Sequence, residues 1–173
     1  MASGKDTAAE YLKGKYDAGI YSFSTMLADV LKRFYLDFSR DNLIKISEAM
    51  RRTFGEDIMA KTMAKDVEND GHELVVVSNA RRPADVEYLS RLPHYVLVEI
   101  YADPGVRYER LAARGQKTDD STKTFGQFMA DHERSTELSI LEVAKQAAEK
   151  INNNGSIEDL HRRLDALVEK YAR

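Results

Sequence analysis

The chain has 173 residues, of which 43% are hydrophobic and 32% charged, a balance typical of one soluble globular domain over residues 1–173. Its 26 lysines and arginines stand against 29 acidic residues, so the formal net charge is −3, which argues against nucleic acid as a partner. The sequence has no cysteine, which excludes disulfides and thiolate metal sites, and no apolar run approaches membrane-spanning length. We expect a cytoplasmic protein without a membrane partner, either a monomer or a homodimer.

The N-terminal half is predicted to be mainly helical. Gly55 is expected to interrupt its longest helical stretch, and Ser24 or Thr25 to cap the helix before that stretch. The elements expected here are, in chain order, a helix over 6–15, a brief strand at 21–24, a helix over 26–38 and a helical stretch over 42–69.

The hydrophobic pattern changes after residue 72. Residues 73–77 form a largely β-branched run, typical of a strand that is buried on both faces. A second strand is predicted over 95–101, and between the two strands residues 83–91 read as a crossover helix with proline in its first turn. Strand, helix and strand together predict one right-handed βαβ unit, and therefore a parallel sheet.

The C-terminal part is expected to return to helix, with Gly115 as the cap of the first one. Residues 151–155 hold too few apolar side chains to be assigned as a strand. The elements expected here are a helix over 104–114, a polar loop over 116–123, a helix over 125–150 and a last amphipathic helix that a capping box at 156–159 opens. The predicted fold class is α/β, with a parallel sheet flanked by helices.

The most specific motif lies at the start of the chain, where Ser3-Gly4-Lys5-Asp6-Thr7 leads into a predicted helix. A phosphate-binding loop reads G-x-x-x-x-G-K-[ST] between a strand and a helix, and Gly4-Lys5 matches its second half. The backbone N–H groups and the helix N-terminus of such a loop attract phosphate, and the lysine adds a positive charge. Asp6 stands where the motif has serine or threonine, with Thr7 one residue later.

The first glycine of that motif would lie two positions before Met1. A central strand missing from the sheet would leave N–H and C=O groups on its neighbours unpaired, at a cost of about 1–3 kcal/mol each. We therefore expect Met1 to be an internal methionine, preceded by about ten residues that hold a β-branched strand and the first glycine.

The string from Ser3 to Ala9 resembles the variant phosphate-binding loop of the phage-type deoxynucleoside monophosphate kinases, where Gly-Lys-Asp-Thr replaces Gly-Lys-Ser-Thr. Those kinases share their fold with adenylate kinases and dephospho-CoA kinases. The resemblance implies a three-layer P-loop NTPase fold, like that of nucleoside monophosphate kinases, with a small lid over about 115–131. Further segments resemble the same group of kinases in the same order. Segment 77–87 resembles their acceptor-side segment, and 108–115 resembles the helix that enters their lid. Residues Asp119, Asp120, Phe128, Glu133 and Arg134 resemble the lid and following helix of an archaeal nucleotide-kinase-like family, and the stretch 153–161 resembles dephospho-CoA kinases.

The same resemblance implies ATP as the phosphoryl donor and Mg²⁺ as its metal. Lys5, with the amides of Ser3 and Gly4, would hold the β- and γ-phosphates, and Thr7 the α-phosphate. Asp6 would be a carboxylate ligand of Mg²⁺, and its alternative role is to complement the helix dipole.

Three arginines around the expected lid are implied to take part. Arg110 would bind the nucleotide, while Arg114 and Arg134 would be catalytic and stabilise the transferring phosphoryl group. Their alternative role is that of solvated helix charges paired with Glu109 or Glu133.

The acceptor side is expected to involve residues of the first predicted strands and the helices after them. Arg81 matches the family's arginine and would clamp the acceptor phosphate, together with Ser24 and Arg51. Asn79 stands where the resembling kinases carry an acid, so it keeps an acceptor oxygen but loses the charge. Arg82 has no counterpart in the family and is equally well explained as a surface charge.

The function that these residues favour is phosphoryl transfer from ATP to a nucleoside or deoxynucleoside monophosphate. One alternative is dephospho-CoA kinase, which the C-terminal stretch favours and Gly-Lys-Asp-Thr disfavours. The other alternative is a non-catalytic nucleotide-binding module or inactive remnant.

Overall fold

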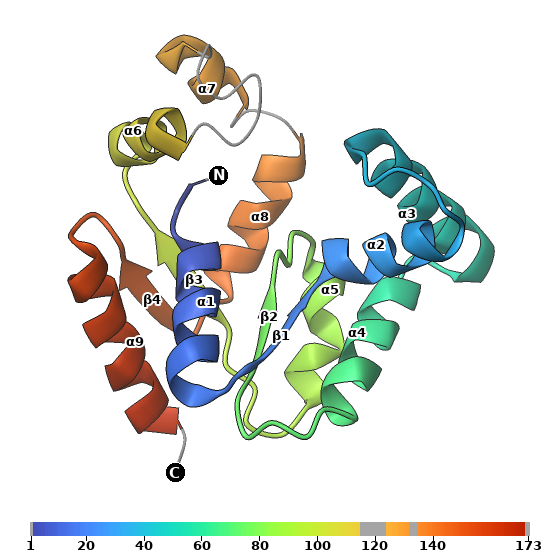
Figure 1. Cartoon of the computed structure of the whole chain (residues 1–173), viewed down its shortest axis with the longest axis horizontal. Helices are drawn as coiled ribbons and strands as arrows, with labels where there is room; N and C mark the ends of the chain where they lie inside the picture. The colour runs from blue at the N-terminus through green and yellow to red at the C-terminus, as the bar shows by residue number, and fades with distance from the viewer. Residues whose placement is uncertain (1, 115–123, 132–134, 172–173) are drawn as a thin grey trace. The chain divides into compact units, whose positions relative to one another are not determined.

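The computed structural model describes residues 2–114, 124–131 and 135–171, and the chain divides into two compact units (Figure 1). Residues 1–12 and 96–173 belong to the first, which we call the terminal unit, and residues 13–95 to the second, the inner unit. Within the described residues each unit holds one pair of parallel strands with helices packed around it. The predicted α/β class with parallel strands is confirmed.

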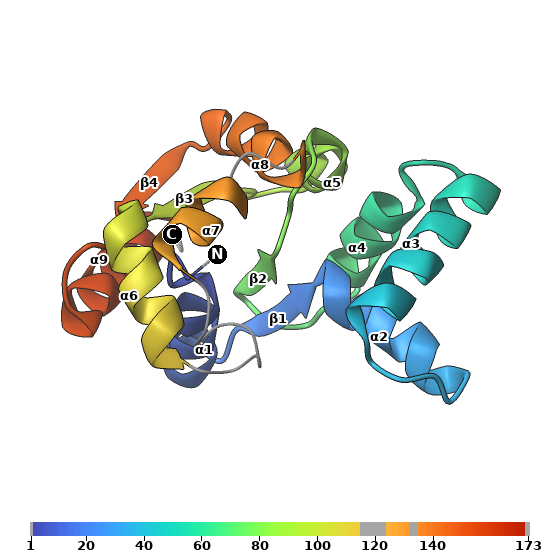
Figure 2. The same cartoon turned by 90° about the horizontal axis from the view of Figure 1, so that it is seen from above.

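The inner unit is built on strands β1 (Gly19–Ser22) and β2 (Val75–Ser78), which run parallel with Gly19 opposite Val75 and Ser22 opposite Ser78. Figure 2 shows its helices α2, α3 and α4 side by side, and Met63, at 0% exposure, lies at the centre of their apolar core. The helices of this unit are α2 (Phe23–Arg33), α3 (Arg40–Phe54), α4 (Ile58–Glu68) and α5 (Pro83–Glu87), followed by the 3-10 turn η1 (Leu89–Arg91).

The boundaries of these helices have local causes. The cap of α2 is Ser22, because its hydroxyl accepts from the Thr25 N–H and the Thr25 hydroxyl accepts from the Ser22 N–H. The prediction of Ser24 or Thr25 as the cap residue was therefore wrong. The helix also ends before the predicted residue 38, since Tyr35 has left-handed backbone with φ +57°. Gly55, with φ +106°, separates α3 from α4 as predicted.

The terminal unit is built on the parallel strands β3 (Val98–Tyr101) and β4 (Glu149–Asn152), with Tyr101 opposite Asn152 at their ends. Figure 1 shows α9 beside α1, and the Tyr11 and His161 rings stack there at 3.7 Å between centroids. The Tyr11 hydroxyl also donates to Asp165 at 2.9 Å. The helices of this unit are α1 (Lys5–Tyr16), which continues into the inner unit, α6 (Pro104–Arg114), α7 (Phe125–Asp131), α8 (Ser135–Lys145) and α9 (Ile157–Tyr171).

Part of the predicted lid over 115–131 is described, namely residues 124–131, which form α7. Phe128 of this helix is fully buried and packs against Tyr108 of α6, at 5.7 Å between ring centroids. The predicted polar loop over 116–123 and the Gly115 cap lie outside the described residues.

Two predictions about the sheet were wrong. The strands predicted over 73–77 and 95–101 are not ladder partners in the described part of the chain, because β2 pairs with β1 and β3 pairs with β4. The segment with α5 and η1 instead leads from one unit into the other. The prediction that this strand is buried on both faces was also wrong, because all four residues of β2 are only half-buried.

The strand β4 falls where a helix over 125–150 and a non-strand at 151–155 were predicted. Only Ile151 of its four residues is buried, and its charged residues have partners that the local sequence does not reveal. Glu149 accepts from Lys170 at 2.5 Å, and Lys150 pairs with Glu99 at 2.9 Å. These cross-element ion pairs make a polar four-residue segment acceptable as an edge strand.

Among the described residues, no helix is both long enough and apolar enough to cross a membrane.

The start of the β1–β2 pair is held by a hydrogen-bonded cluster around Asp70. Its carboxylate accepts from the Tyr21 hydroxyl at 2.6 Å and from the His72 N–H at 2.7 Å, and its side chain is 7% exposed. A Cβ at Gly19 would lie 2.9 Å from both carboxylate oxygens, so a larger residue there would displace the Asp70 side chain. The bond from Tyr21, followed by the His72 N–H, lowers the pKa of Asp70 to about 2.

Asp70→Asn should therefore destabilise the protein at neutral pH, and by a smaller amount in acid. Because the native pKa of Asp70 lies below the value of about 3.9 for a free aspartate, its contribution is complete above about pH 5 and is lost as the pH falls through about 2. The free energy of unfolding of wild type and variant, measured by urea denaturation from pH 7 down, should converge over that window. Asp29→Asn, at an exposed position on α2, is the control. A constant difference at every pH would contradict the prediction.

Candidate functional site

The residues of the N-terminal turn, Ser3 to Thr7, are placed at the beginning of α1. Gly4 has φ +98°, a conformation that strongly favours glycine, and its carbonyl accepts the first helical bond from the Ala8 N–H at 2.9 Å. The N–H groups of the first helical turn have no partners within their own helix, and the dipole of α1 gives that end a partial positive charge. The turn therefore has the backbone chemistry of an anion site.

Asn153, directly after β4, fixes the shape of this turn. Its side-chain Nδ2 donates to the Ser3 carbonyl at 2.8 Å, and the residue is only 5% exposed. A Cβ on Gly4 would come within 2.1 Å of that nitrogen. The second glycine of the motif is thus required twice, by its positive φ and by the close approach of Asn153.

Lys5 and Asp6 form an ion pair at 2.7 Å, with 42% and 50% of their side chains exposed. Thr7 is exposed on the same turn of helix. No group of three or more histidine, cysteine or acidic side chains is placed to hold a metal among the described residues. The Asp6 carboxylate is of the kind that Mg²⁺ accepts as a ligand.

The arginines expected around the lid have different positions in the structure. Arg110 donates to the carbonyls of Asn153, at 2.7 Å, and Gly155, at 3.1 Å, so its guanidinium is bound to the loop after β4. The backbone of Arg114 ends α6, but its side chain lies outside the described part of the chain, as does all of Arg134. Their catalytic role, and contact of Arg110 with the nucleotide, stay predictions.

The residues predicted for the acceptor lie in the inner unit, near the carboxyl ends of β1 and β2. Ser22 stands opposite Ser78 in the ladder, so Ser24 and Asn79 follow at the same edge. The Ser24 hydroxyl lies 3.0 Å from the Ser22 hydroxyl. Asn79 has φ +65°, which asparagine tolerates better than most residues. In open parallel sheets this edge is where ligands bind.

The turn after Asn79 is organised by Asp85, which is 7% exposed. One oxygen of its carboxylate accepts from the N–H groups of Arg81 and Arg82, at 2.9 and 3.0 Å. The backbone of both arginines is therefore fixed while their side chains remain exposed.

Arg51, on α3, lies close to the same turn. Its guanidinium donates to the Ser47 hydroxyl and is partly buried. Burial lowers the pKa of Arg51 below its usual range, and the positive charge of Arg82 lowers it further. The nearby carboxylates of Asp85, Glu56 and Glu48 offset part of this effect. Arg82, which had no assigned role, therefore lies close enough to Arg51 for their positive charges to repel each other.

Donor-side and acceptor-side residues belong to different units, so the structure groups Ser3 to Thr7 with Arg110 and groups Ser24, Arg51, Asn79 and Arg81 separately. The sequence interpretation missed Asn153 and Asp85. Asp85 had a local signal, since it stands three residues after the Arg82 that precedes Pro83, where a carboxylate accepts backbone N–H groups. Asn153 had none beyond the run of asparagines before Gly155.

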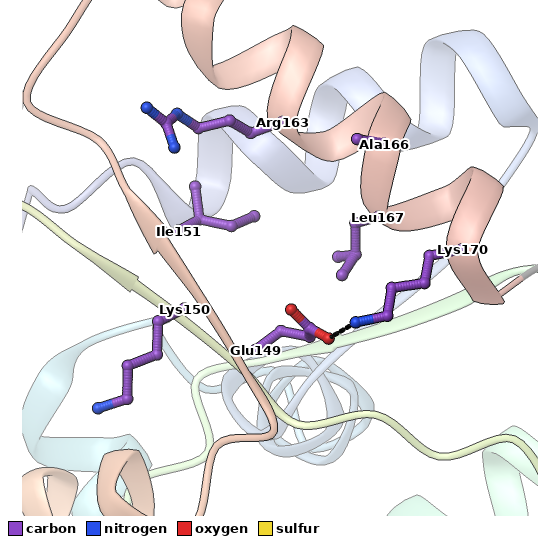
Figure 3. A pocket seen from close by; sticks show the side chains of 7 residues that line it. All are labelled: Glu149, Lys150, Ile151, Arg163, Ala166, Leu167 and Lys170. Atoms are coloured by element: carbon purple, nitrogen blue, oxygen red, sulfur yellow. Dashed lines mark hydrogen bonds and ion pairs between the residues drawn. The ribbon is translucent and has the colours of Figure 1, made fainter.

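A separate open pocket of about 240 Å³ lies between β4 and the second half of α9 (Figure 3). The ion pair between Glu149 and Lys170 crosses its floor, and Ile151 and Leu167 give it an apolar side. Its strand residues start at Glu149, the end of β4 away from Asn153. The pocket is therefore an edge groove of β4 and does not include the N-terminal turn.

The parallel strands, the flanking helices and the glycine-lysine turn define the fold of the P-loop kinases. A solved shikimate kinase from Bacteroides thetaiotaomicron shares it at a TM-score of 0.64 and 16% identity, over 98% of this chain and 93% of that one. The solved structure of TT1252 from Thermus thermophilus does so at 0.62 and 19%, with the same coverage. A family profile described as AAA domain matches residues 2–126, and the chain belongs to this family.

Curated relatives agree over almost the whole chain. A UPF0200 protein of Saccharolobus solfataricus is 26% identical over 172 residues, which are 97% of this chain and 88% of the relative. A UPF0200 protein of Methanocaldococcus jannaschii is 27% identical over 170 residues, 97% of this chain and 85% of the relative. The predicted P-loop kinase fold is confirmed, while the specific likeness to phage-type deoxynucleoside monophosphate kinases remains part of the proposal below.

Gly4→Ala should destabilise the protein by about 1–3 kcal/mol, because alanine resists the positive φ. Its Cβ would also displace Asn153. Gly14→Ala, in the same helix α1 and with open space around the new Cβ, should stabilise it by about 0.5–1 kcal/mol. Urea denaturation of both variants measures the contrast. Equal effects of the two substitutions would show that the Gly4 conformation is not required.

Proposed function

We propose that the protein is a nucleotide kinase that transfers the γ-phosphoryl group of ATP, with Mg²⁺, to a nucleoside or deoxynucleoside monophosphate. The observation that carries the proposal is the N-terminal turn, in which Gly4 has a positive φ and Lys5 opens α1. Backbone N–H groups, a helix N-terminus and a lysine converge there, which is the chemistry that a triphosphate requires.

On the donor side, Lys5 and the amides of Ser3 and Gly4 would hold the β- and γ-phosphates, with Thr7 towards the α-phosphate. Asp6 would bind Mg²⁺ directly or through water, releasing Lys5 from their exposed ion pair. The bound metal would neutralise charge on the phosphates. In phosphoryl transfer an acceptor oxygen bonds to phosphorus as the bond to the leaving ADP breaks. The protein therefore mainly has to position the two substrates and to supply positive charge.

On the acceptor side, the charge distribution favours a phosphorylated substrate. The positive charges of Arg51 and Arg82 repel each other, and Arg51 is also partly desolvated. A dianionic phosphate would remove that repulsion and offer bidentate bonds to a guanidinium. Arg81, with its backbone held by Asp85, would clamp the same group. Ser24 and Asn79 would contact the remainder of the acceptor from the edge of the β1–β2 pair.

The catalytic residues of the proposal are Lys5, Arg114 and Arg134, with Arg110 on the nucleotide side. Arg114 and Arg134 would surround the transferring group when the lid region over about 115–131 covers it. Excluding water in this way would prevent ATP from being hydrolysed instead of used.

Dephospho-CoA is the second acceptor to consider, since the stretch 153–161 resembles dephospho-CoA kinases and contacts the N-terminal turn through Asn153. The alternative outside enzymes is a nucleotide-binding module without turnover. A coupled ADP-release assay over a panel of nucleoside and deoxynucleoside monophosphates, dephospho-CoA and shikimate separates these functions. ATP binding without ADP release on any member of the panel would contradict the kinase proposal.

Lys5→Ala should lower turnover on the best acceptor by about 10²–10³-fold, because Lys5 would stabilise charge that develops on the phosphates. The thermal midpoint should change little, since its ion pair with Asp6 is exposed. Lys13→Ala, at an exposed position of the same helix, is the matched control. Near-normal turnover of Lys5→Ala would remove this turn from the active site.

Arg51→Ala should raise the KM for the acceptor by about 10–100-fold, as expected for a charged hydrogen bond to phosphate, and leave the KM for ATP unchanged. Arg51→Lys should recover only part of the loss, because lysine lacks the planar fork. Arg52→Ala, one residue along α3 and exposed, should behave as wild type. A change in the KM for ATP alone would place Arg51 on the donor side.

A further inference from the structure

We infer that Asn153 is a positioning residue for the N-terminal turn, and that Arg110 acts on the turn through Asn153 without touching the nucleotide. This inference rests on the proposed function, because it assigns the residues that aim the phosphate-binding amides. It also changes the role expected of Arg110.

Asn153 makes three hydrogen bonds, two through its backbone and one through its side chain. Its backbone N–H donates to the Tyr101 carbonyl at 2.8 Å, and its carbonyl accepts from Arg110 at 2.7 Å. Its side-chain Nδ2 donates to the Ser3 carbonyl at 2.8 Å, from a position that is 5% exposed. A buried side chain with both backbone groups bonded has little freedom to move, so the Ser3 carbonyl has a fixed direction.

That direction determines where the next amide points. The peptide between Ser3 and Gly4 is planar and trans, so its C=O and N–H point in opposite directions. Because the Ser3 carbonyl points at Asn153, the Gly4 N–H points away from it. A flipped peptide would replace this donor with a carbonyl oxygen and repel a phosphate. Such a flip is accessible to a turn that lacks the bond to Asn153, because the glycine at position 4, here with a positive φ, adopts positive and negative φ about equally readily.

Arg110 secures the loop from which Asn153 acts. Its two terminal nitrogens donate to the carbonyls of Asn153 and Gly155, which fixes the backbone on both sides of Asn154. These bonds use two of the five N–H donors of the guanidinium, one on each terminal nitrogen, and would be lost if Arg110 turned towards a ligand. Arg110 therefore belongs to the support of the turn.

The test is the affinity for ADP and for inorganic pyrophosphate, measured by calorimetry on the full chain. Asn153→Ala should weaken both ligands by about tenfold, because both use the amides of the turn. Asn153→Ser, which keeps a polar group too short to reach Ser3, should do the same and serves if the alanine variant is unstable. The matched control is Asn154→Ala, whose side chain accepts from the Asp103 N–H at 2.7 Å, and it should bind both ligands within about twofold of wild type.

A double-mutant cycle tests the role of Arg110. Arg110→Ala should weaken pyrophosphate in the wild-type background and have no further effect in the Asn153→Ala background, because both changes release the same turn. Losses that add in full would mean that Arg110 contacts the ligand itself, and would overturn its assignment as a positioning residue.

Lys5→Ala distinguishes failure of the inference from failure of the function. If Lys5→Ala weakens ADP while both Asn153 variants bind as wild type, the inference is wrong and the proposed function stands. If Lys5→Ala also binds ADP as wild type, the turn is not a phosphate site and both are overturned. If the Asn154→Ala control weakens binding as much as Asn153→Ala, the loop acts as a whole and Asn153 has no specific role.

Discussion

The hydrogen bond from the Asn153 side chain to the Ser3 carbonyl joins residues 150 positions apart and ties the N-terminal turn to the end of β4. The bond requires that β4 end at Asn152 beside β3, and that position 4 carry no Cβ. Helix α9 lies against the same turn, since a Cβ at Gly4 would be 3.7 Å from the Leu160 side chain of α9. The stacked rings of Tyr11 and His161 hold α1 and α9 together. Backbone geometry at the turn is thus maintained by the last strand and helix of the chain.

A second constraint is the parallel direction of each strand pair. Parallel strands bring their carboxyl ends to one edge, so residues that follow them gather there whatever their separation in sequence. Asn153 follows β4 beside the end of β3, and Ser24 and Asn79 follow β1 and β2 in the same way. In each unit the polar side chains lie next to a helix N-terminus or a backbone turn with fixed N–H groups. Under the proposed function, this arrangement would let each small strand pair position a charged ligand.

The sequence predicted the elements whose signals are local. The helix from Pro104 to Arg114 and the break at Gly55 depend on residues inside or next to the element, and the glycine-lysine turn depends on one short motif. The strand β4 could not be predicted in this way, because its charges are neutralised by Lys170 and Glu99 from distant segments. The proximity of Arg82 to Arg51 was equally hidden, since it arises when α3 packs near the turn after β2. What the sequence lacked was therefore pairing between elements, which only the tertiary structure supplies.

The partners of each lysine or arginine show whether its charge is available for a ligand or is used to hold the fold. Lys5 is paired with Asp6 at an exposed position, and such a pair contributes only about 0–1 kcal/mol, so an arriving phosphate can replace the carboxylate at little cost. Arg82 and Glu56 are 3.8 Å apart and exposed, which makes that pair equally weak. Arg110 differs, because its partners are two backbone carbonyls whose hydrogen bonds would be left unmade if it turned towards a ligand. The weak ion pairs of Lys5 and Arg82 thus leave one cation in each unit able to turn towards a ligand. The stronger bonds of Arg110 keep the backbone beside the N-terminal turn in place.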